Sequence, residues 1–135
     1  MSVQLCPCQS NKNYEICCQP LHLFKKHAKT AKALMRSRYS AFVKGQVDYL
    51  IETQYPAKRT PNGRADIQNN IKNTTWLGLK ILSAKKGKPK DLTGLVEFIA
   101  TYTEPNQPGI VHQLHERSEF VKENNRWYYV SGTIY

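Results

Sequence analysis

The spacing of apolar residues changes near residue 75, and the change divides the chain into a helical part and a part made of strands. Residues 31–44 place their apolar side chains on one side of a helix with ~100° between neighbours; these side chains are Leu34, Met35, Tyr39, Ala41 and Phe42. Thr30 suits the N-cap of this helix, and Gly45 ends it. Residues 47–55 predict a second, short helix that stops before a proline, and residues 64–73 predict a third, mostly polar one.

The second half of the chain predicts four strands. Runs rich in β-branched and aromatic residues are separated there by short segments of turn-forming residues. The runs cover residues 75–85, 92–103, 110–122 and 126–134. Short connections favour antiparallel neighbours, so this part of the chain predicts an antiparallel meander. Helices first and strands second is the order of an α+β fold.

Length and composition indicate a globular protein with one main domain and a small appendage. The chain has 135 residues, of which 40% are hydrophobic, and its mean hydropathy is −0.60. No apolar stretch reaches the ~20 residues of a membrane span, and the first residues lack the basic and apolar regions of a secretory signal. These features predict a cytoplasmic protein, in which thiols stay reduced and clustered cysteines favour metal binding over disulfides.

The candidate metal ligands are the four cysteines of the chain, Cys6, Cys8, Cys17 and Cys18. Zinc takes four thiolates in a tetrahedron about 2.3 Å from each sulfur, and turn-forming residues between the two pairs allow the chain to loop back. A disulfide between adjacent cysteines is strained, so one structural zinc ion is the favoured interpretation, and a redox dithiol or disulfide pair is the alternative. Four protein ligands leave no open position for catalysis at the metal.

The segment around these cysteines resembles the SEC-C zinc motif, which is also found at the C-terminus of the SecA translocation ATPase. It shares with that motif the four ligand positions and the aromatic residue at Tyr14. It departs from the motif at Gln9 and Asn11, where glycine is usual. Asparagine adopts a left-handed backbone more readily than glutamine, so we expect the first loop to differ in conformation while the metal site is kept.

Motifs across the rest of the chain resemble the bacterial YchJ family, which joins an N-terminal SEC-C motif to a nuclear-transport-factor-2-like domain. They lie at residues 34–42 (LMRSRYSAF), 48–51 (DYLI), 75–79 (TWLGL), 115–120 (HERSEF) and 127–132 (WYYVSG). The resemblance implies an α+β, cystatin-like cone in which helices wrap a curved antiparallel sheet. It divides the chain into a zinc motif at residues 1–24 and a cone domain at residues 25–135. It implies no particular reaction.

Basic residues outnumber acidic ones by 20 to 10, which gives a net charge of +10 and a pI near 9.6. Four thiolates with one zinc ion leave about +8. Such a charge favours polyanionic partners such as nucleic acid, ribosomes or acidic proteins, and the alternative is a basic surface without a dedicated partner. Lysines gather in two clusters, the first at Lys25, Lys26, Lys29 and Lys32 and the second at Lys85, Lys86, Lys88 and Lys90. Both clusters suit binding to phosphate backbones or acidic surfaces, and the second also suits protection of a sheet edge.

The cone implied by the resemblance encloses a cavity, and three polar residues are candidates to line it. Arg38 lies within the apolar stripe of the first long helix, and a buried guanidinium needs a carboxylate partner. Alternation along the third strand places Glu116 on the core face, so we predict an Arg38–Glu116 pair. This pair has a structural interpretation, as a link between helix and sheet, and a functional one, as an anchor in a ligand pocket. His112 shares the parity of Glu116 and is the candidate general base of an enzyme.

These observations leave three hypotheses for function. The leading one is a zinc-dependent protein- or ribosome-interaction module, because the similar motif of SecA docks the acidic chaperone SecB and contacts ribosomes. The second is small-molecule binding or catalysis in the cavity; the chain lacks a nucleophile elbow, a phosphate-binding loop and a zinc-protease helix, which favours a protein that is not an enzyme. The third is nonspecific, charge-driven RNA binding. The fold also permits a homodimer through the open face of the sheet.

Overall fold

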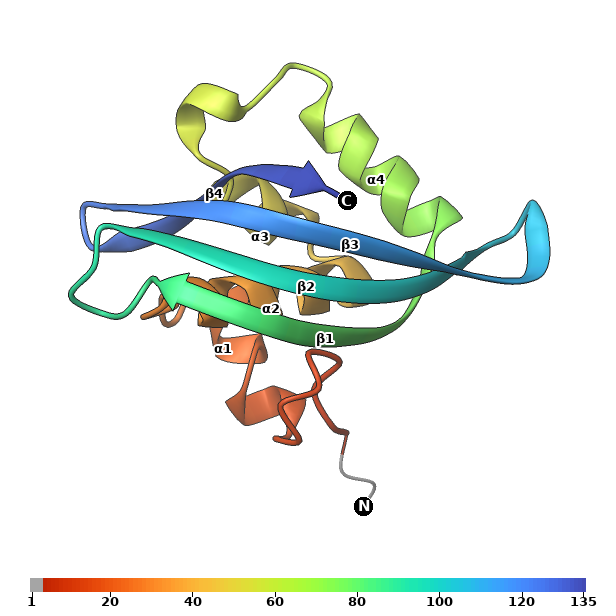
Figure 1. Cartoon of the computed structure of the whole chain (residues 1–135), viewed down its shortest axis with the longest axis horizontal. Coiled ribbons are helices and arrows are strands. Elements are labelled where there is room, and N and C mark those ends of the chain that lie inside the picture. Colours follow the sequence, from red (N-terminus) through yellow and green to blue (C-terminus); the bar gives the residue numbers. More distant parts are fainter. Residues whose placement is uncertain (1–3) are drawn as a thin grey trace.

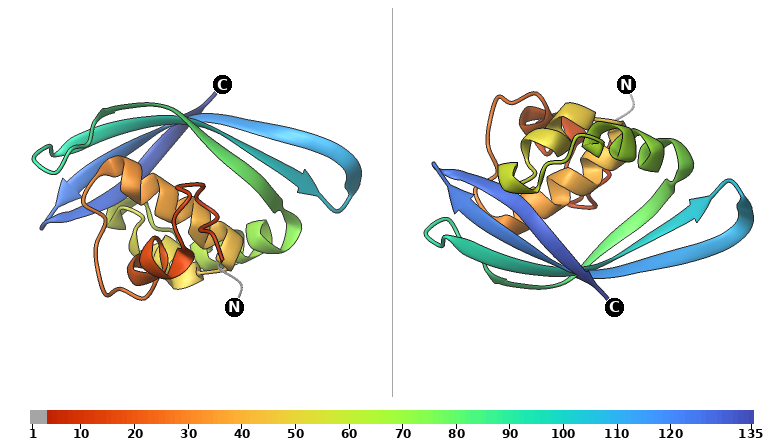
Figure 2. Two further views of the ribbon diagram at one scale, coloured as in Figure 1. Left: turned by 90° about the horizontal axis from the view of Figure 1, so that it is seen from below. Right: turned by 90° about the horizontal axis from the view of Figure 1, so that it is seen from above.

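The computed structural model describes residues 4–135 and has the α+β arrangement that the sequence predicts. Its four strands form one antiparallel sheet in the order β1-β2-β3-β4, which is the predicted meander (Figure 1). The sheet is curved, and all the helices lie on its concave side (Figure 2). The N-terminal segment projects below α2 beside β1, at the opposite side of the helical layer from α4 (Figure 1). No helix in residues 4–135 is both long and apolar enough to cross a bilayer.

The central helix is α2 (Ala31–Lys44), and its bounds are those predicted from the sequence. The hydroxyl of Thr30 accepts a hydrogen bond from the backbone N–H of Ala33 at 3.0 Å, so it caps the first turn. Gly45 adopts a left-handed conformation with φ of 72° and ends the helix. Local sequence signals therefore suffice to place this element.

The second helix, α3 (Val47–Glu52), is shorter than the predicted 47–55. Its C-terminal continuation runs alongside the edge strand of the sheet: Tyr129 donates a backbone hydrogen bond to Thr53, and Tyr55 donates one to Tyr129. These two bonds replace helical ones, because an edge strand offers unpaired backbone groups. A turn of 3-10 helix, η2 (Pro56–Lys58), follows, and then α4 (Gly63–Asn73), close to its predicted bounds.

The strands are β1 (Thr75–Lys86), β2 (Thr93–Glu104), β3 (Gln107–Glu123) and β4 (Arg126–Ile134). The third strand begins three residues before the predicted start, because the pairing of Glu104 with Gln107 closes a tight turn past an irregularity near Tyr102. This extension lengthens the β2–β3 hairpin beyond the helices (Figure 1).

The core lies between α2 and the concave face of the sheet, as alternation along each strand predicts. The buried apolar side chains of the sheet are those of Leu79, Val96, Phe98, Ala100, Phe120 and Trp127. The start of α2 approaches the β1–β2 hairpin closely: a side chain at Gly87 or Gly94 would overlap the methyl group of Ala31. Gly87 has φ of 74° and accepts the backbone N–H of Ala31 at 2.9 Å, so this corner requires glycine for both space and conformation.

Candidate metal centre and inner cavity

The N-terminal knuckle, residues 5–18, folds as two short arms that bring the cysteines together. Leu5 and Asn13 form an antiparallel bridge, and the backbone N–H of Cys6 donates to Lys12 at 2.8 Å, which closes the first arm. The second arm is η1 (Tyr14–Ile16), a single turn that leads into Cys17 and then into α1 (Gln19–His22). The chain thus loops back between the two pairs of cysteines, as the turn-forming residues predict.

We expected the first loop of the knuckle to differ in backbone conformation from a loop that contains glycine, but it does not. Gln9 and Asn11 have φ of 64° and 66°, so both adopt the left-handed conformation that glycine usually supplies. This conformation costs ~1–2 kcal/mol in a residue such as glutamine. The side chain of Gln9 offsets part of this cost, because its Oε1 accepts the backbone N–H of Leu79 in β1 at 2.6 Å. Gln9 lies over Gly78, where an added methyl group would sit 3.4 Å from its amide nitrogen.

The four thiols form one cluster whose sulfur atoms all lie within 4.8 Å of one another. Cys8 and Cys17 are 3.6 Å apart, and Cys17 and Cys18 are 3.9 Å apart. A tetrahedron with metal–sulfur bonds of about 2.3 Å places its sulfurs ~3.8 Å apart, so the cluster fits one four-coordinate metal ion. Cys6, Cys8 and Cys18 are buried, and only Cys17 reaches the surface.

The thiols differ in acidity because they donate hydrogen bonds to one another. The bond from Cys18 lowers the pKa of Cys8 to about 4 by stabilising its thiolate, and burial acts in the opposite direction. The same bond raises the pKa of Cys18, and burial raises that of Cys17. Thiolates are the form that binds metal, and the lowered pKa of Cys8 favours this form at that position.

Three contacts fasten the knuckle to the central helix. The guanidinium of Arg36 donates to the carbonyl of Cys8 at 2.6 Å, and the Cys6 sulfur lies 3.6 Å from the hydroxyl of Ser40. Buried His22 donates from Nε2 to the carbonyl of Ser37 at 2.9 Å and accepts from the Tyr14 hydroxyl at 2.7 Å. Burial lowers the pKa of His22, which keeps the ring neutral and suited to this donor–acceptor pair.

Arg38 and Glu116 both line a cavity of about 200 Å³ beneath α2, but the predicted direct pair is wrong. Arg38 is buried and donates to the carbonyl of Leu50 at 2.8 Å and to the hydroxyl of Thr53 at 2.6 Å. Glu116 instead accepts from the hydroxyls of Ser118 at 2.6 Å and Tyr129 at 3.3 Å. The carbonyl of Leu50 lies in the last turn of α3 close to α2, so it accepts the guanidinium N–H in place of a group on the sheet.

Burial lowers the pKa of Arg38 to about 10, and the nearby phenols and Glu116 oppose that change, so the guanidinium stays charged at neutral pH. Its Cζ lies 4.8 Å from the ring centroid of Tyr129. The predicted placement of Glu116 on the core face is confirmed: Glu116 is half-buried and lines the cavity, and Ser118, two residues further on the same face, is fully buried. The carboxyl group of Glu116 lies over Gly132, where any side chain would overlap it.

His112, the candidate general base, is half-buried and stacks on Tyr102 with ring centroids 5.1 Å apart. Its Nε2 is 3.9 Å from a carboxylate oxygen of Glu104, beyond hydrogen-bond distance. It does not line the cavity that holds Arg38 and Glu116. The structure therefore does not bring the three polar candidates together as one catalytic constellation.

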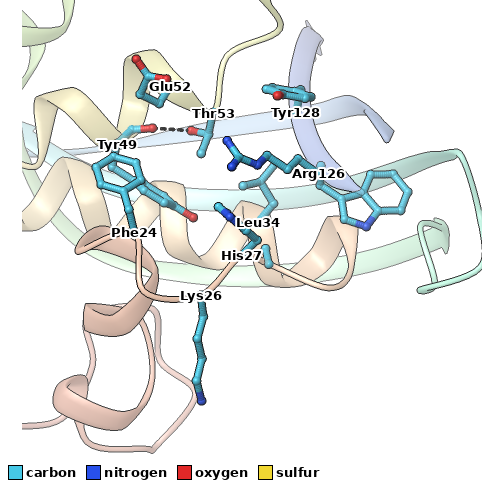
Figure 3. A pocket seen from close by; sticks show the side chains of 11 residues that line it. Phe24, Lys26, His27, Leu34, Tyr49, Glu52, Thr53, Arg126 and Tyr128 are labelled. Carbon is cyan, nitrogen blue, oxygen red and sulfur yellow. Dashed lines mark hydrogen bonds between the residues drawn. The ribbon is translucent and has the colours of Figure 1, made fainter. Parts of the chain in front are cut away.

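A second hollow lies between the segment that follows α1, the helix α3 and β4 (Figure 3). Lys26, His27 and Arg126 surround it, and its volume is about 50 Å³. This volume corresponds to ~2 water molecules, so the hollow is too small for an organic ligand.

Three residues of these sites were missed by sequence reasoning. Gln9 did carry a signal, since a glutamine at a position favouring glycine calls for a compensating contact. His22 and Asn70, which lines the cavity that holds Arg38 and Glu116, had no signal in the sequence, because the place of each depends on elements that are distant in the chain.

A four-cysteine knuckle joined to a curved sheet wrapped by helices defines a metal-binding protein on a cone-shaped scaffold. The family described as "YchJ, middle NTF2-like domain" matches residues 30–132, and the SEC-C motif matches residues 4–20. The chain therefore belongs to the YchJ family, as its motifs predict.

Similar proteins extend over nearly the whole chain. A UPF0225 protein of Pectobacterium carotovorum subsp. carotovorum is 44% identical over 130 residues, which are 94% of this chain and 81% of that protein. The solution structure of a SEC-C motif containing protein from Rhodopseudomonas palustris has a TM-score of 0.86 at 35% identity and covers 96% of this chain and 98% of its own. The crystal structure of a SEC-C motif containing protein from Psychrobacter arcticus has a TM-score of 0.77 at 32% identity, with coverage of 99% and 84%.

Proposed function

We propose that this protein is a zinc-stabilised docking module for an acidic segment of a protein partner, free or on the ribosome. The observation that carries the proposal is the apolar surface of the knuckle. Leu5 and Ile16 of the knuckle are 57% and 71% exposed, and Phe24, which follows α1, is 46% exposed, although a segment this small has few large apolar residues to spare. Large apolar side chains exposed on so short a segment support a role in an interaction.

A groove beside the knuckle supports the proposal. It has a volume of about 340 Å³; one wall is formed by Leu5 and Pro7 of the knuckle, and the other by Val43, Trp76 and Leu77. The contact between Gln9 and β1 fixes the first wall against the second. A peptide in this groove therefore meets a rigid surface, which lowers the entropy lost on binding.

Zinc has a structural role in this proposal. Four thiolates complete its coordination, so the metal shapes the surface and leaves no position for a substrate. A reducing compartment such as the cytoplasm keeps the thiols available to the metal. Lysines in the knuckle and in the segment that follows α1 attract an acidic partner and speed its approach; Lys12, Lys25, Lys26 and Lys29 are all exposed.

A pull-down from cytoplasmic extract at two salt concentrations tests the proposal. The baits are the wild type, Cys8→Ser, and Ile16→Ser, which changes the apolar surface and keeps all four thiols. We expect both variants to lose the same partner. Leu92→Ser is the matched control, because Leu92 is 70% exposed at the far β1–β2 turn.

Identical partners from wild type, Cys8→Ser and Ile16→Ser would refute the docking proposal. Capture of RNA that persists in Cys8→Ser and falls steeply with salt would instead indicate charge-driven nucleic-acid binding.

A further inference from the structure

The cavity beneath α2 combines apolar walls with a polar end, which is the usual composition of a small-molecule site. It lies between α2, α4 and the inner face of the sheet, and its volume is about 200 Å³. The walls are formed by Met35, Phe42, Trp76, Phe98, Ala100 and Leu114. A cavity of ~150 Å³ holds benzene, so this one suits a single ring with a short substituent.

The polar end contains two opposite charges that do not pair with each other. Arg38 uses Nη1 for Leu50 and Thr53, and among residues 4–135 its other N–H groups have no hydrogen-bond acceptor. Tyr129 contacts both charges, with its ring face toward Arg38 and its hydroxyl toward Glu116. The cavity therefore offers a fixed donor and a fixed acceptor while its two charges balance.

Two further polar atoms in the cavity wall lack a partner within the described part of the chain: the indole N–H of Trp76 and the side-chain oxygen of Asn70. Both are shielded from water, and a buried polar atom without a hydrogen bond costs ~1–3 kcal/mol. A molecule in the cavity that reached these atoms would supply the missing partners. These atoms add one donor and one acceptor to the site.

We propose that this cavity binds a small, neutral, planar molecule in which a hydrogen-bond donor stands beside an acceptor, as in an aromatic amide or a lactam. The acceptor of the ligand faces Arg38, its donor faces Glu116, and its ring lies between the aromatic walls. A ligand with a single charge matches one of the two protein charges and is repelled by the other, so neutrality is the selective property. This site is separate from the zinc knuckle and does not depend on its docking role.

Benzamide, benzoate and benzamidine are matched probes, because they share one shape and differ in charge. A titration of the full, zinc-loaded chain followed by proton–nitrogen NMR gives the dissociation constant of each. Trp76 borders both the cavity and the groove beside the knuckle, so its indole N–H signal detects the probe, and the effect of changing Glu116, which lines only the cavity, assigns the binding to the cavity. The indole N–H signal of Trp127, which bonds to the carbonyl of Lys29, is the internal control. We expect benzamide to move only the Trp76 signal, with a dissociation constant of ~0.1–10 mM for a ligand of this size.

Benzoate and benzamidine should bind at least ~10-fold more weakly than benzamide. Glu116→Gln keeps an acceptor for the Ser118 and Tyr129 hydroxyls and removes the negative charge. This change should invert the preference and improve benzoate binding by at least ~10-fold, a gain that misfolding does not produce. Glu119→Gln is the control, since Glu119 is exposed on the other face of the same strand.

The proposal is overturned if no probe moves the Trp76 signal at 20 mM, or if all three probes bind equally to the wild type. An unchanged order of affinities in Glu116→Gln also overturns it. If the pull-down finds no partner but benzamide binds, only the proposed docking function is refuted. If the pull-down succeeds but benzamide does not bind, only the proposed cavity ligand is refuted.

Discussion

The backbone at Gln9 shows how one side chain compensates for an unfavourable conformation. Its left-handed φ of 64° favours glycine, yet its amide group reaches β1 and accepts the N–H of Leu79. Glycine at this position would remove both the backbone strain and the contact with β1. The loop of the motif therefore favours glycine, whereas the contact with the sheet favours glutamine. The sequence reveals the conflict, and the fold reveals how it is resolved.

Two substitutions at this position separate the two effects. Gln9→Ala loses the bond to Leu79 and keeps the strain, so we expect the zinc-loaded protein to lose ~1–2 kcal/mol in its free energy of unfolding. Gln9→Gly loses the same bond without the strain and should be more stable than Gln9→Ala by ~1 kcal/mol. Urea unfolding measures both, and equal stability of the two variants would contradict the left-handed conformation.

Gly132 is a position where the absence of a side chain leaves room for the carboxyl group of Glu116. A methyl group there overlaps the carboxyl group of Glu116, which then leaves Ser118 and Tyr129. We expect Gly132→Ala to lower the free energy of unfolding by ~1–3 kcal/mol. Gly63→Ala is the control: the added atom makes an ordinary contact of 3.6 Å in the first turn of α4, so thermal unfolding should show no loss.

The helices owe their mutual arrangement to buried polar side chains that connect them. Arg38 of α2 holds the C-terminal carbonyl of Leu50 in α3, and His22 of α1 holds the carbonyl of Ser37 in α2. Leu50 lies in the last turn of α3, where carbonyls have no partner within the helix, whereas Ser37 lies within α2 and its carbonyl accepts an N–H from His22. The knuckle is thereby attached to α2 in one orientation.

Replacement of His22 tests this attachment. His22→Phe keeps an aromatic ring and leaves the Tyr14 hydroxyl buried without an acceptor, so we expect a loss of ~1–3 kcal/mol in the free energy of unfolding. Hydrogen exchange should increase in residues 5–24 and stay unchanged in β2 and β3. His27→Phe provides the comparison because His27 is exposed, and an equal effect of the two changes would argue against the proposed role of His22.

Across the complete fold, the knuckle and the main domain have separate interiors. Cys6, Cys8, Tyr14 and Cys18 form one buried cluster, while the second lies between α2 and the sheet. Metal binding supplies much of the stability of a segment too small for a core of its own. The sheet and its helices have enough apolar burial to fold without it.

Removal of the metal should therefore unfold only part of the chain. After chelation we expect amide exchange to accelerate by at least ~100-fold at Cys6 and Tyr14, whose N–H groups bond within the knuckle, because local opening no longer breaks metal bonds. Amides in the β2–β3 ladder should stay protected. Exchange mass spectrometry distinguishes this result from global unfolding, which would show that the main domain depends on the metal.

Local sequence is sufficient for the features that depend on neighbours in the chain. The period of apolar residues, Thr30 and Gly45 set the bounds of α2; short turns set the antiparallel order of the strands; cysteine spacing indicates the metal cluster. Each of these is decided by geometry within ~15 residues, where spacing alone limits what the chain can do.

Only the folded chain decides which distant groups meet. The position at which α3 ends depends on the unpaired edge of β4. The partner of Arg38 is set by the proximity of α3, and the backbone conformation of Gln9 is set by its contact with β1. Alternation correctly places Glu116 on the inner face, yet it cannot choose between Arg38 and the nearer hydroxyls of Ser118 and Tyr129. A buried polar group takes the closest partner with good geometry, and closeness between distant segments is a property of packing rather than of sequence pattern.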